Sequence, residues 1–197
     1  MDTALILAGG SATRFGRGKA LALVDGIPMI RRVGDALAPL AGETIVSVAE
    51  EEAEKTFRML FPSATFVLDR RRGKGPIEGI RRGSERARGV RLLVAPCDSP
   101  LLRSELYRLL LASLGTHEAA VPQLAAIDPV RAVYRTSAVQ RALKSGEKGV
   151  PSPSALVDRL DAVFVQEPRL REVDPRLDSF LDVNREEDLA HVAARLT

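Results

Sequence analysis

Leu7-Ala8-Gly9-Gly10-Ser11-Ala12-Thr13-Arg14-Phe15-Gly16-Arg17-Gly18-Lys19 directly follows an apolar run at residues 4–7. This order is typical of a β-strand that ends in a glycine-rich loop. The glycines allow the backbone to turn and to approach a ligand closely, and successive N–H groups can bind phosphate oxygens. Arg14 and Lys19 add positive charge, so the segment predicts a nucleoside triphosphate site. The spacing matches neither GxxxxGK[ST] nor GxGxxG, because Lys19 is followed by Ala20.

Apolar runs alternate with amphipathic stretches beyond this loop. The first half predicts strands at 3–7, 44–48, 65–68 and 91–95 and helices at 28–38, 51–60, 77–88 and 104–113. The second half predicts strands at 118–121, 130–134 and 162–165, helices at 136–144 and 185–196, and a loop at 145–154. Regular alternation of strands and helices predicts a three-layer α/β/α fold, with a Rossmann-like, mostly parallel sheet and an antiparallel element in the second half.

Length and composition set the domain organisation. With 197 residues and 45% hydrophobic content, the chain predicts one domain, divided into a nucleotide-binding half at 1–114 and an acceptor-substrate half at 115–197. No run approaches the roughly 20 apolar residues of a membrane span, and no signal peptide is evident. The single cysteine, Cys97, excludes an internal disulfide. We therefore expect a cytoplasmic protein without a membrane or nucleic-acid partner, since its net charge is only +3 and its aromatic content 4%.

Several polar side chains follow predicted strands. In open α/β sheets, ligands bind outside the carboxyl ends of the strands, where the strand order reverses. For a 3-2-1-4 order, the Gly9 loop, Asp69 and Asp98 would face one crevice. Asp98 is the predicted Mg²⁺ ligand, because Mg²⁺ takes one or two carboxylates beside phosphate oxygens. The alternative for Asp98 is an Asx-turn that starts a helix.

Asp182 and Asn184 are the second pair of candidate metal ligands. They lie two residues apart in a stretch expected to be extended, which would put both on the same face. Either side chain can complete a metal site with Asp98. The alternative for Asn184 is the N-cap of the last predicted helix.

Five motifs occur in sequence order along almost the whole chain. They are the glycine loop, Gly75-Pro76-Ile77-Glu78-Gly79, Pro96-Cys97-Asp98-Ser99-Pro100, Arg131-Ala132-Val133-Tyr134, and the stretch from Phe180 to Leu189. Together they resemble the nucleotidyltransferases, and within that superfamily the molybdenum cofactor guanylyltransferases. The resemblance implies Mg²⁺-dependent transfer of GMP from GTP to molybdopterin with release of pyrophosphate. It also implies molybdoenzymes as recipients of the product, while we expect a monomer or a weak homo-oligomer.

The resemblance also suggests roles for particular residues. Arg14, Lys19 and Asp98 would be catalytic. The nucleotide would contact Leu7, Ala8, Gly9, Gly10, Lys19, Asp69 and Asp98, with Asp69 accepting hydrogen bonds from N1–H and N2–H of guanine. The metal would lie at Asp98, Asp182 and Asn184. The arginine-rich region adds Arg71, Arg72, Gly75 and Gly79 as candidate acceptor-binding residues.

Two departures and two rival functions remain open at this stage. Related enzymes often carry Asn where this chain has Asp182, which either tightens metal binding or removes this residue from the site. They also often carry Asn after the second strand, where this chain has Ala49-Glu50. The rival functions are a GTP:adenosylcobinamide-phosphate guanylyltransferase and a non-catalytic nucleotide-binding protein. Cys97 lacks a convincing histidine partner and is interpreted as a packing residue.

Overall fold

The computed structural model describes residues 1–9, 16–69, 75–144 and 151–196. Its strands lie close to the positions that the sequence predicts. They are β1 (Thr3–Ala8), β2 (Leu23–Val24), β3 (Ile27–Pro28), β4 (Glu43–Val48), β5 (Thr65–Leu68), β6 (Arg91–Pro96), β7 (Ala119–Gln123), β8 (Ala132–Arg135) and β9 (Ala162–Gln166).

The helices alternate with the strands through most of the chain. The α-helices are α1 (Met29–Leu37), α2 (Glu51–Leu60), α3 (Pro76–Arg86), α4 (Ser104–Leu114), α5 (Thr136–Lys144), α6 (Pro153–Val157), α7 (Glu167–Val173) and α8 (Glu186–Ala193). Three short 3₁₀ helices complete the described elements: η1 (Gly16–Leu21), η2 (Ala38–Leu40) and η3 (Asp178–Phe180). In the described part of the chain, each helix is too short or too polar to span a bilayer.

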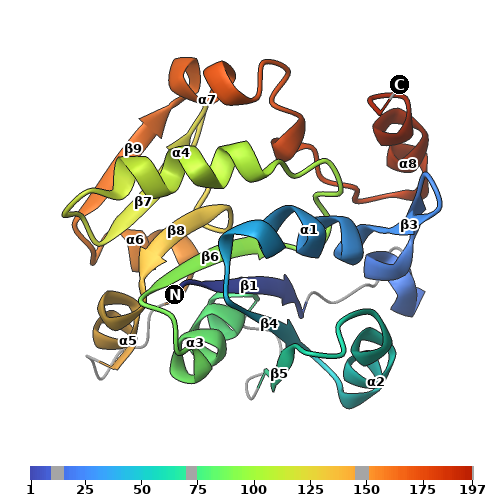
Figure 1. Ribbon diagram of the computed structural model, residues 1–197, viewed down its shortest axis with the longest axis horizontal. Helices are drawn as coiled ribbons and strands as arrows, with labels where there is room; N and C mark the ends of the chain where they lie inside the picture. The colour runs from blue at the N-terminus through green and yellow to red at the C-terminus, as the bar shows by residue number, and fades with distance from the viewer. Residues whose placement is uncertain (10–15, 70–74, 145–150, 197) are drawn as a thin grey trace.

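Seven strands form one sheet in the order β5-β4-β1-β6-β8-β7-β9 (Figure 1). The first four pair in parallel, which confirms the predicted 3-2-1-4 order. Strand β8 runs antiparallel to both β6 and β7, and β9 returns parallel to β7. The mostly parallel α/β sheet with an antiparallel element in the second half is therefore confirmed.

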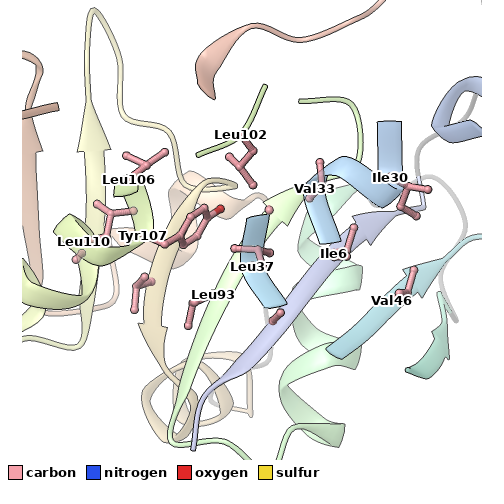
Figure 2. Packing of buried hydrophobic residues seen from close by; sticks show 14 of the residues in the cluster. Ile6, Ile30, Val33, Leu37, Val46, Leu93, Leu102, Leu106, Tyr107 and Leu110 are labelled. Carbon is pink, nitrogen blue, oxygen red and sulfur yellow. The ribbon is translucent and has the colours of Figure 1, made fainter. Parts of the chain in front are cut away.

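Helices cover both faces of the sheet because side chains alternate along each buried strand. On β1, Ile6 points into the cluster beneath α1 and α4, while Leu5 points into the cluster beneath α3 and α5. Figure 2 shows the first cluster, in which Leu37 of α1 and Tyr107 of α4 pack over the strands. The Tyr107 hydroxyl donates a hydrogen bond of 2.5 Å to the backbone oxygen of Val94, so the buried phenol is satisfied. These two clusters give the predicted three layers.

A third, smaller cluster lies between the β2–β3 hairpin and α8. Val24 of β2, Leu101, Val183 and Val192 of α8 are buried together. In Figure 1, α8 stands beside the β2–β3 hairpin, and its residues contact β2. This packing brings the segment before α8 back to the first half of the sheet.

Several elements differ from the sequence prediction. The β2–β3 hairpin was not predicted, although its turn, Asp25-Gly26, has positive φ at both residues (52° and 73°), as type I′ hairpins require. Helix α7 was also missed. The predicted loop at 145–154 overlaps helix α6, whose start is capped by Ser152, where the Oγ atom accepts a 3.2 Å hydrogen bond from the N–H of Ala155. Residues 145–150 of that loop lie outside the described residues.

Candidate active site

The carboxyl ends of the parallel strands place Asp69 and Asp98 at one edge of the sheet. The N–H of Asp69 donates to the backbone oxygen of Val48, 3.0 Å away, and the N–H of Cys97 donates to that of Leu7, 3.1 Å away. Each bond extends the strand pairing just beyond the strand end. The structure thus places both predicted aspartates just beyond the carboxyl ends of parallel strands, where the rule for open α/β sheets expects ligands to bind.

Lys19 joins two of the predicted site residues. Its Nζ atom lies 2.7 Å from Oδ2 of Asp98 and 3.0 Å from Oδ1 of Asn184. The side chains of Lys19 and Asp98 are 20% and 23% exposed, so they are accessible yet partly shielded from water. A cationic group therefore sits between two oxygen donors that come from distant parts of the chain.

Asn184 reaches this position through a backbone tether and a turn. The N–H of Val183 donates a 2.9 Å hydrogen bond to the backbone oxygen of Asp98. The carboxylate of Asp188 accepts from the backbone N–H groups of Asn184 and Arg185, at 2.7 and 2.8 Å, and so begins α8. The alternative role of Asn184, the N-cap of the last helix, is not the one found, because Arg185 holds that position and the amide oxygen of Asn184 faces Lys19.

Asp182 has different partners from Asn184. Its Oδ1 atom accepts a 2.8 Å hydrogen bond from Ser99 and also bonds the guanidinium of Arg131. Burial raises the pKa of Asp182, an effect that Asp98 strengthens and Arg131 opposes. The two side chains thus have different partners in the structure: Asp182 binds Ser99 and Arg131, while Asn184 binds Lys19.

Asp69 lies in a more apolar setting than Asp98. Its Oδ1 atom accepts a 2.8 Å hydrogen bond from Ser47 on β4. Burial raises the pKa of Asp69, Glu78 raises it further, and Ser47 and Arg82 act in the opposite direction. A Cβ atom on Gly9 would collide with Oδ2 of Asp69, which shows that this carboxylate packs directly against the start of the glycine loop.

The glycines of α3 have separate structural roles. Gly75 is exposed, has a φ of 63° and precedes Pro76 at the start of the helix, a conformation that favours glycine. Gly79 is buried, and a Cβ there would lie 2.8 Å from Oγ of Ser47 and 2.9 Å from Leu7. Gly79 allows close packing of the helix on the sheet, and the expectation that it contacts an acceptor stays a prediction.

Four predicted site residues lie outside the described residues. They are Gly10, Arg14, Arg71 and Arg72. Leu7 and Ala8 form the end of β1, and the backbone oxygen of Leu7 is taken up by the bond from Cys97. Burial, together with the nearby Asp98 carboxylate, raises the pKa of the Cys97 thiol to about 12. Cys97 packs against the hydrophobic cluster, as expected for a packing residue.

The donor set at Lys19 fits a divalent cation. Asp98 and Asn184 present two hard oxygen ligands that already converge on one positive group. Within the ranges that the structure describes, no three His, Cys, Asp or Glu side chains gather in a metal-binding group. This suits Mg²⁺, which takes few protein ligands and completes its shell with water and phosphate oxygens. Asp98 and Asn184 are accordingly the residues that would hold it.

Comparison with known families agrees with this geometry. The family described as the MobA-like NTP transferase domain matches residues 4–163, which include the glycine loop, Asp69 and Asp98. The chain belongs to this family. The resemblance seen in the sequence motifs is therefore confirmed, and this MobA-like transferase is a nucleotidyltransferase.

Individual relatives span nearly all of the MobA-like chain. A probable molybdenum cofactor guanylyltransferase from Methanosarcina mazei is 33% identical over 199 residues, covering 96% of this chain and 89% of the relative. The crystal structure of molybdopterin-guanine dinucleotide biosynthesis protein A from Archaeoglobus fulgidus has a TM-score of 0.81 and 25% identity, and the match covers 100% and 98% of the two chains.

A more distant structure shares the fold alone. The 4-diphosphocytidyl-2C-methyl-D-erythritol synthase from Anaerococcus prevotii has a TM-score of 0.73 at 14% identity, covering 100% of this chain and 98% of that one. Because that protein's name refers to a cytidine nucleotide, the fold by itself does not determine the base.

Sequence reasoning missed three polar residues of the MobA-like site. Ser47 supports Asp69, while Ser99 and Arg131 bind Asp182. Ser99 and Arg131 lie within two of the motifs quoted from the sequence, but neither residue was given a role of its own there. The signal that could have identified Arg131 is a charged residue placed directly before a strand that begins with apolar, buried residues.

Proposed function

We propose that the protein is a Mg²⁺-dependent guanylyltransferase that transfers GMP from GTP to the phosphate of molybdopterin and releases pyrophosphate. The observation that carries the proposal is the convergence of Asp98 and Asn184 on the Lys19 ammonium at the carboxyl edge of the sheet. A binding-only protein does not need a metal-binding carboxylate beside the phosphate site. The names of the relatives from Methanosarcina mazei and Archaeoglobus fulgidus support the choice of molybdopterin as acceptor.

Asp69 supports guanine as the base. A carboxylate can accept hydrogen bonds from both N1–H and N2–H of guanine, whereas adenine and cytosine do not present this pair of donors. Ser47 fixes one oxygen of Asp69, and the other lies against Gly9 at the start of the glycine-rich segment. The raised pKa of Asp69 follows from burial and indicates a partly dry setting, in which such hydrogen bonds discriminate well.

The chemistry requires positioning and charge more than a covalent catalyst. A phosphate oxygen of the acceptor attacks the α-phosphorus of GTP in line, the bond from that phosphorus to the bridging oxygen breaks, and pyrophosphate leaves with the electron pair. Lys19 offsets the charge that develops on the leaving group. Mg²⁺ bound by Asp98 and Asn184 would neutralise the triphosphate and orient it. No enzyme nucleophile is needed, in agreement with the high pKa of the Cys97 thiol.

A nucleotide and acceptor panel tests the proposal. The purified protein is incubated with Mg²⁺, with each of GTP, CTP and ATP, and with either molybdopterin or adenosylcobinamide phosphate, while pyrophosphate release is followed. We expect release with GTP and molybdopterin, and its loss when EDTA removes the metal. An Asp98→Ala sample controls for contaminating transferases.

The other outcomes separate the rival functions. Release with GTP and the corrinoid acceptor alone would assign the protein to cobalamin synthesis, and binding of GTP without any release would favour a non-catalytic protein. Since GTP is an intracellular nucleotide, we propose that the enzyme acts in the cytoplasm. We further propose that it is a monomer or a weak homo-oligomer and that it passes its product to molybdoenzymes. Size-exclusion chromatography with light scattering tests the assembly.

A further inference from the structure

Arg131 is a buried guanidinium beside the candidate site. It directly precedes β8, and its side chain is only 4% exposed. A charge removed from water in this way is stable only when it is paired and hydrogen-bonded. Its partners therefore indicate what this cation does.

The partners of Arg131 form a closed network. Its Nη1 atom donates to Asp128 at 2.5 Å, and its Nη2 atom donates to Oγ of Ser99 at 2.6 Å and to Oδ1 of Asp182. The hydroxyl of Ser99 donates in turn to the same Oδ1 atom at 2.8 Å. One oxygen of Asp182 is thus held from two sides, and the flat fork of arginine suits this geometry better than a lysine would.

This network ties together the two segments that carry the metal donors. Ser99 directly follows Asp98, and Asp182 precedes Asn184 by two residues. The bond from the N–H of Val183 to the backbone oxygen of Asp98 lies between these contacts. Anchoring Asp182 therefore fixes the distance between the two donor segments.

The charge arrangement suggests a function besides stability. Asp182 carries a negative charge close enough to Asp98 to interact with it. Without a paired cation, Asp182 would compete with Asn184 for a bound metal. Among the described residues, Nε of Arg131 is buried without a hydrogen-bond partner, which costs stability. A group that is incompletely satisfied in the fold is often retained because the site needs it.

We propose that Arg131 is a positioning residue that binds Asp182 and excludes this carboxylate from the metal site, leaving Asp98 and Asn184 as the protein's donors. The inference rests on the proposed function, because it concerns the metal of the same reaction.

Binding of Mn²⁺ alone to the full chain, measured by electron paramagnetic resonance, tests this role without nucleotide or acceptor. Arg131→Met should tighten Mn²⁺ binding by roughly tenfold, because Asp182 becomes an uncompensated negative charge near the metal. The double variant Arg131→Met, Asp182→Asn should return the affinity to that of the wild type. Asp182→Asn alone should change the affinity less than about twofold. In GTP turnover, Arg131→Met should lower kcat, and the double variant should regain most of it.

Arg135→Met is the matched control. Arg135 is the last residue of β8, the strand that Arg131 precedes, and it donates to the backbone oxygens of His117 and Gly115. Its loss should lower the melting temperature without changing Mn²⁺ affinity. If Arg131→Met does not fold, the Mn²⁺ affinities of Arg131→Lys and Asp182→Asn are measured instead. Arg131→Lys should then raise the Mn²⁺ affinity by less than the tenfold expected for Arg131→Met.

The inference is overturned by unchanged or weaker Mn²⁺ binding in the Arg131 variants, by a large loss of affinity in Asp182→Asn, or by the absence of Mn²⁺ binding in the wild type. Failure of the proposed function looks different. In that case the nucleotide panel shows no guanylyl transfer, while the Mn²⁺ affinities of the variants keep the expected order.

Discussion

Asp69 and Asp98 follow two parallel strands and occupy the same edge of the sheet, yet their surroundings are opposite. Asp98 forms an ion pair with Lys19 at 2.7 Å. Asp69 takes its short hydrogen bond from the neutral hydroxyl of Ser47, and burial raises its pKa. One carboxylate is suited to cations, and the other is suited to neutral N–H donors. The strand end places a carboxylate at this edge of the sheet, but the neighbouring side chains determine what it binds.

Replacement of Asp98 should have the largest effect. Asp98→Ala removes the proposed metal donor and the partner of Lys19. Because a bound metal contributes several kcal/mol to the transition state, turnover of GTP should fall on the order of 10³-fold. Steady-state pyrophosphate release measures it, and circular dichroism should show an intact fold. Asp161→Ala is the control, because that aspartate is exposed and pairs with His117. Near-normal turnover by a folded Asp98→Ala protein would remove Asp98 from the metal site.

Replacement of Asp69 should affect base choice more than chemistry. Asp69→Asn loses a charged acceptor for guanine, which is worth roughly 1.5–3 kcal/mol, so kcat/KM for GTP should fall about 10- to 100-fold. The preference for GTP over ITP, which lacks the N2 amino group, should largely disappear. Ser47→Ala keeps the carboxylate and should show a smaller loss. Equal loss with GTP and ITP would argue against base recognition by Asp69.

The raised pKa of Asp69 adds a pH dependence to the same comparison. A protonated carboxyl cannot accept both guanine N–H groups, so GTP affinity should fall as the pH drops through this pKa, which lies above that of an ordinary aspartate. Isothermal titration of GTP at a series of pH values should show this decline in the wild type. The decline should be absent in Asp69→Asn.

Gly9 controls the position of Asp69, so its substitution should have a moderate effect. A Cβ at Gly9 must displace the Asp69 carboxylate, whereas a Cβ at Gly18 meets nothing within 4 Å. Overpacking of this kind costs about 1–3 kcal/mol, and we expect Gly9→Ala to raise the KM for GTP roughly tenfold. Gly18→Ala should behave like the wild type in the same assay. Equal effects of the two variants would mean that the loop backbone, and not Asp69, determines the loss.

Cys97 should give the smallest effect, although it directly precedes Asp98. Its thiol has a pKa raised to about 12 by burial, so little reactive thiolate is present near neutral pH. Cys97→Ala should leave turnover within about twofold of the wild type, since the proposed in-line transfer needs no enzyme nucleophile. Treatment with iodoacetamide should likewise leave activity intact, and inactivation would show that the thiol is exposed to reagents.

The parallel half of the fold could be predicted because its signals are local. The apolar runs that form β1, β4, β5 and β6 are continuous in sequence, and the strand-end rule then placed Asp69 and Asp98 in one crevice. The ion pair of Arg131 with Asp182 could not be predicted, since it joins residues 51 positions apart and depends on burial. The β2–β3 hairpin was not predicted because each of its strands is only two residues long, which is too short to show the alternation of apolar and polar residues typical of a strand.

The contact between Lys19 and Asn184 spans 165 positions of sequence and has a consequence for biosynthesis. Translation adds about 5–20 residues per second, and the parallel strands can pair while the chain is still emerging from the ribosome. The Lys19 ammonium meets its amide partner only after residue 184 has left the exit tunnel. A nascent chain thus gains most of its sheet well before it gains a complete site, so an immature protein is structured before it is able to consume nucleotide.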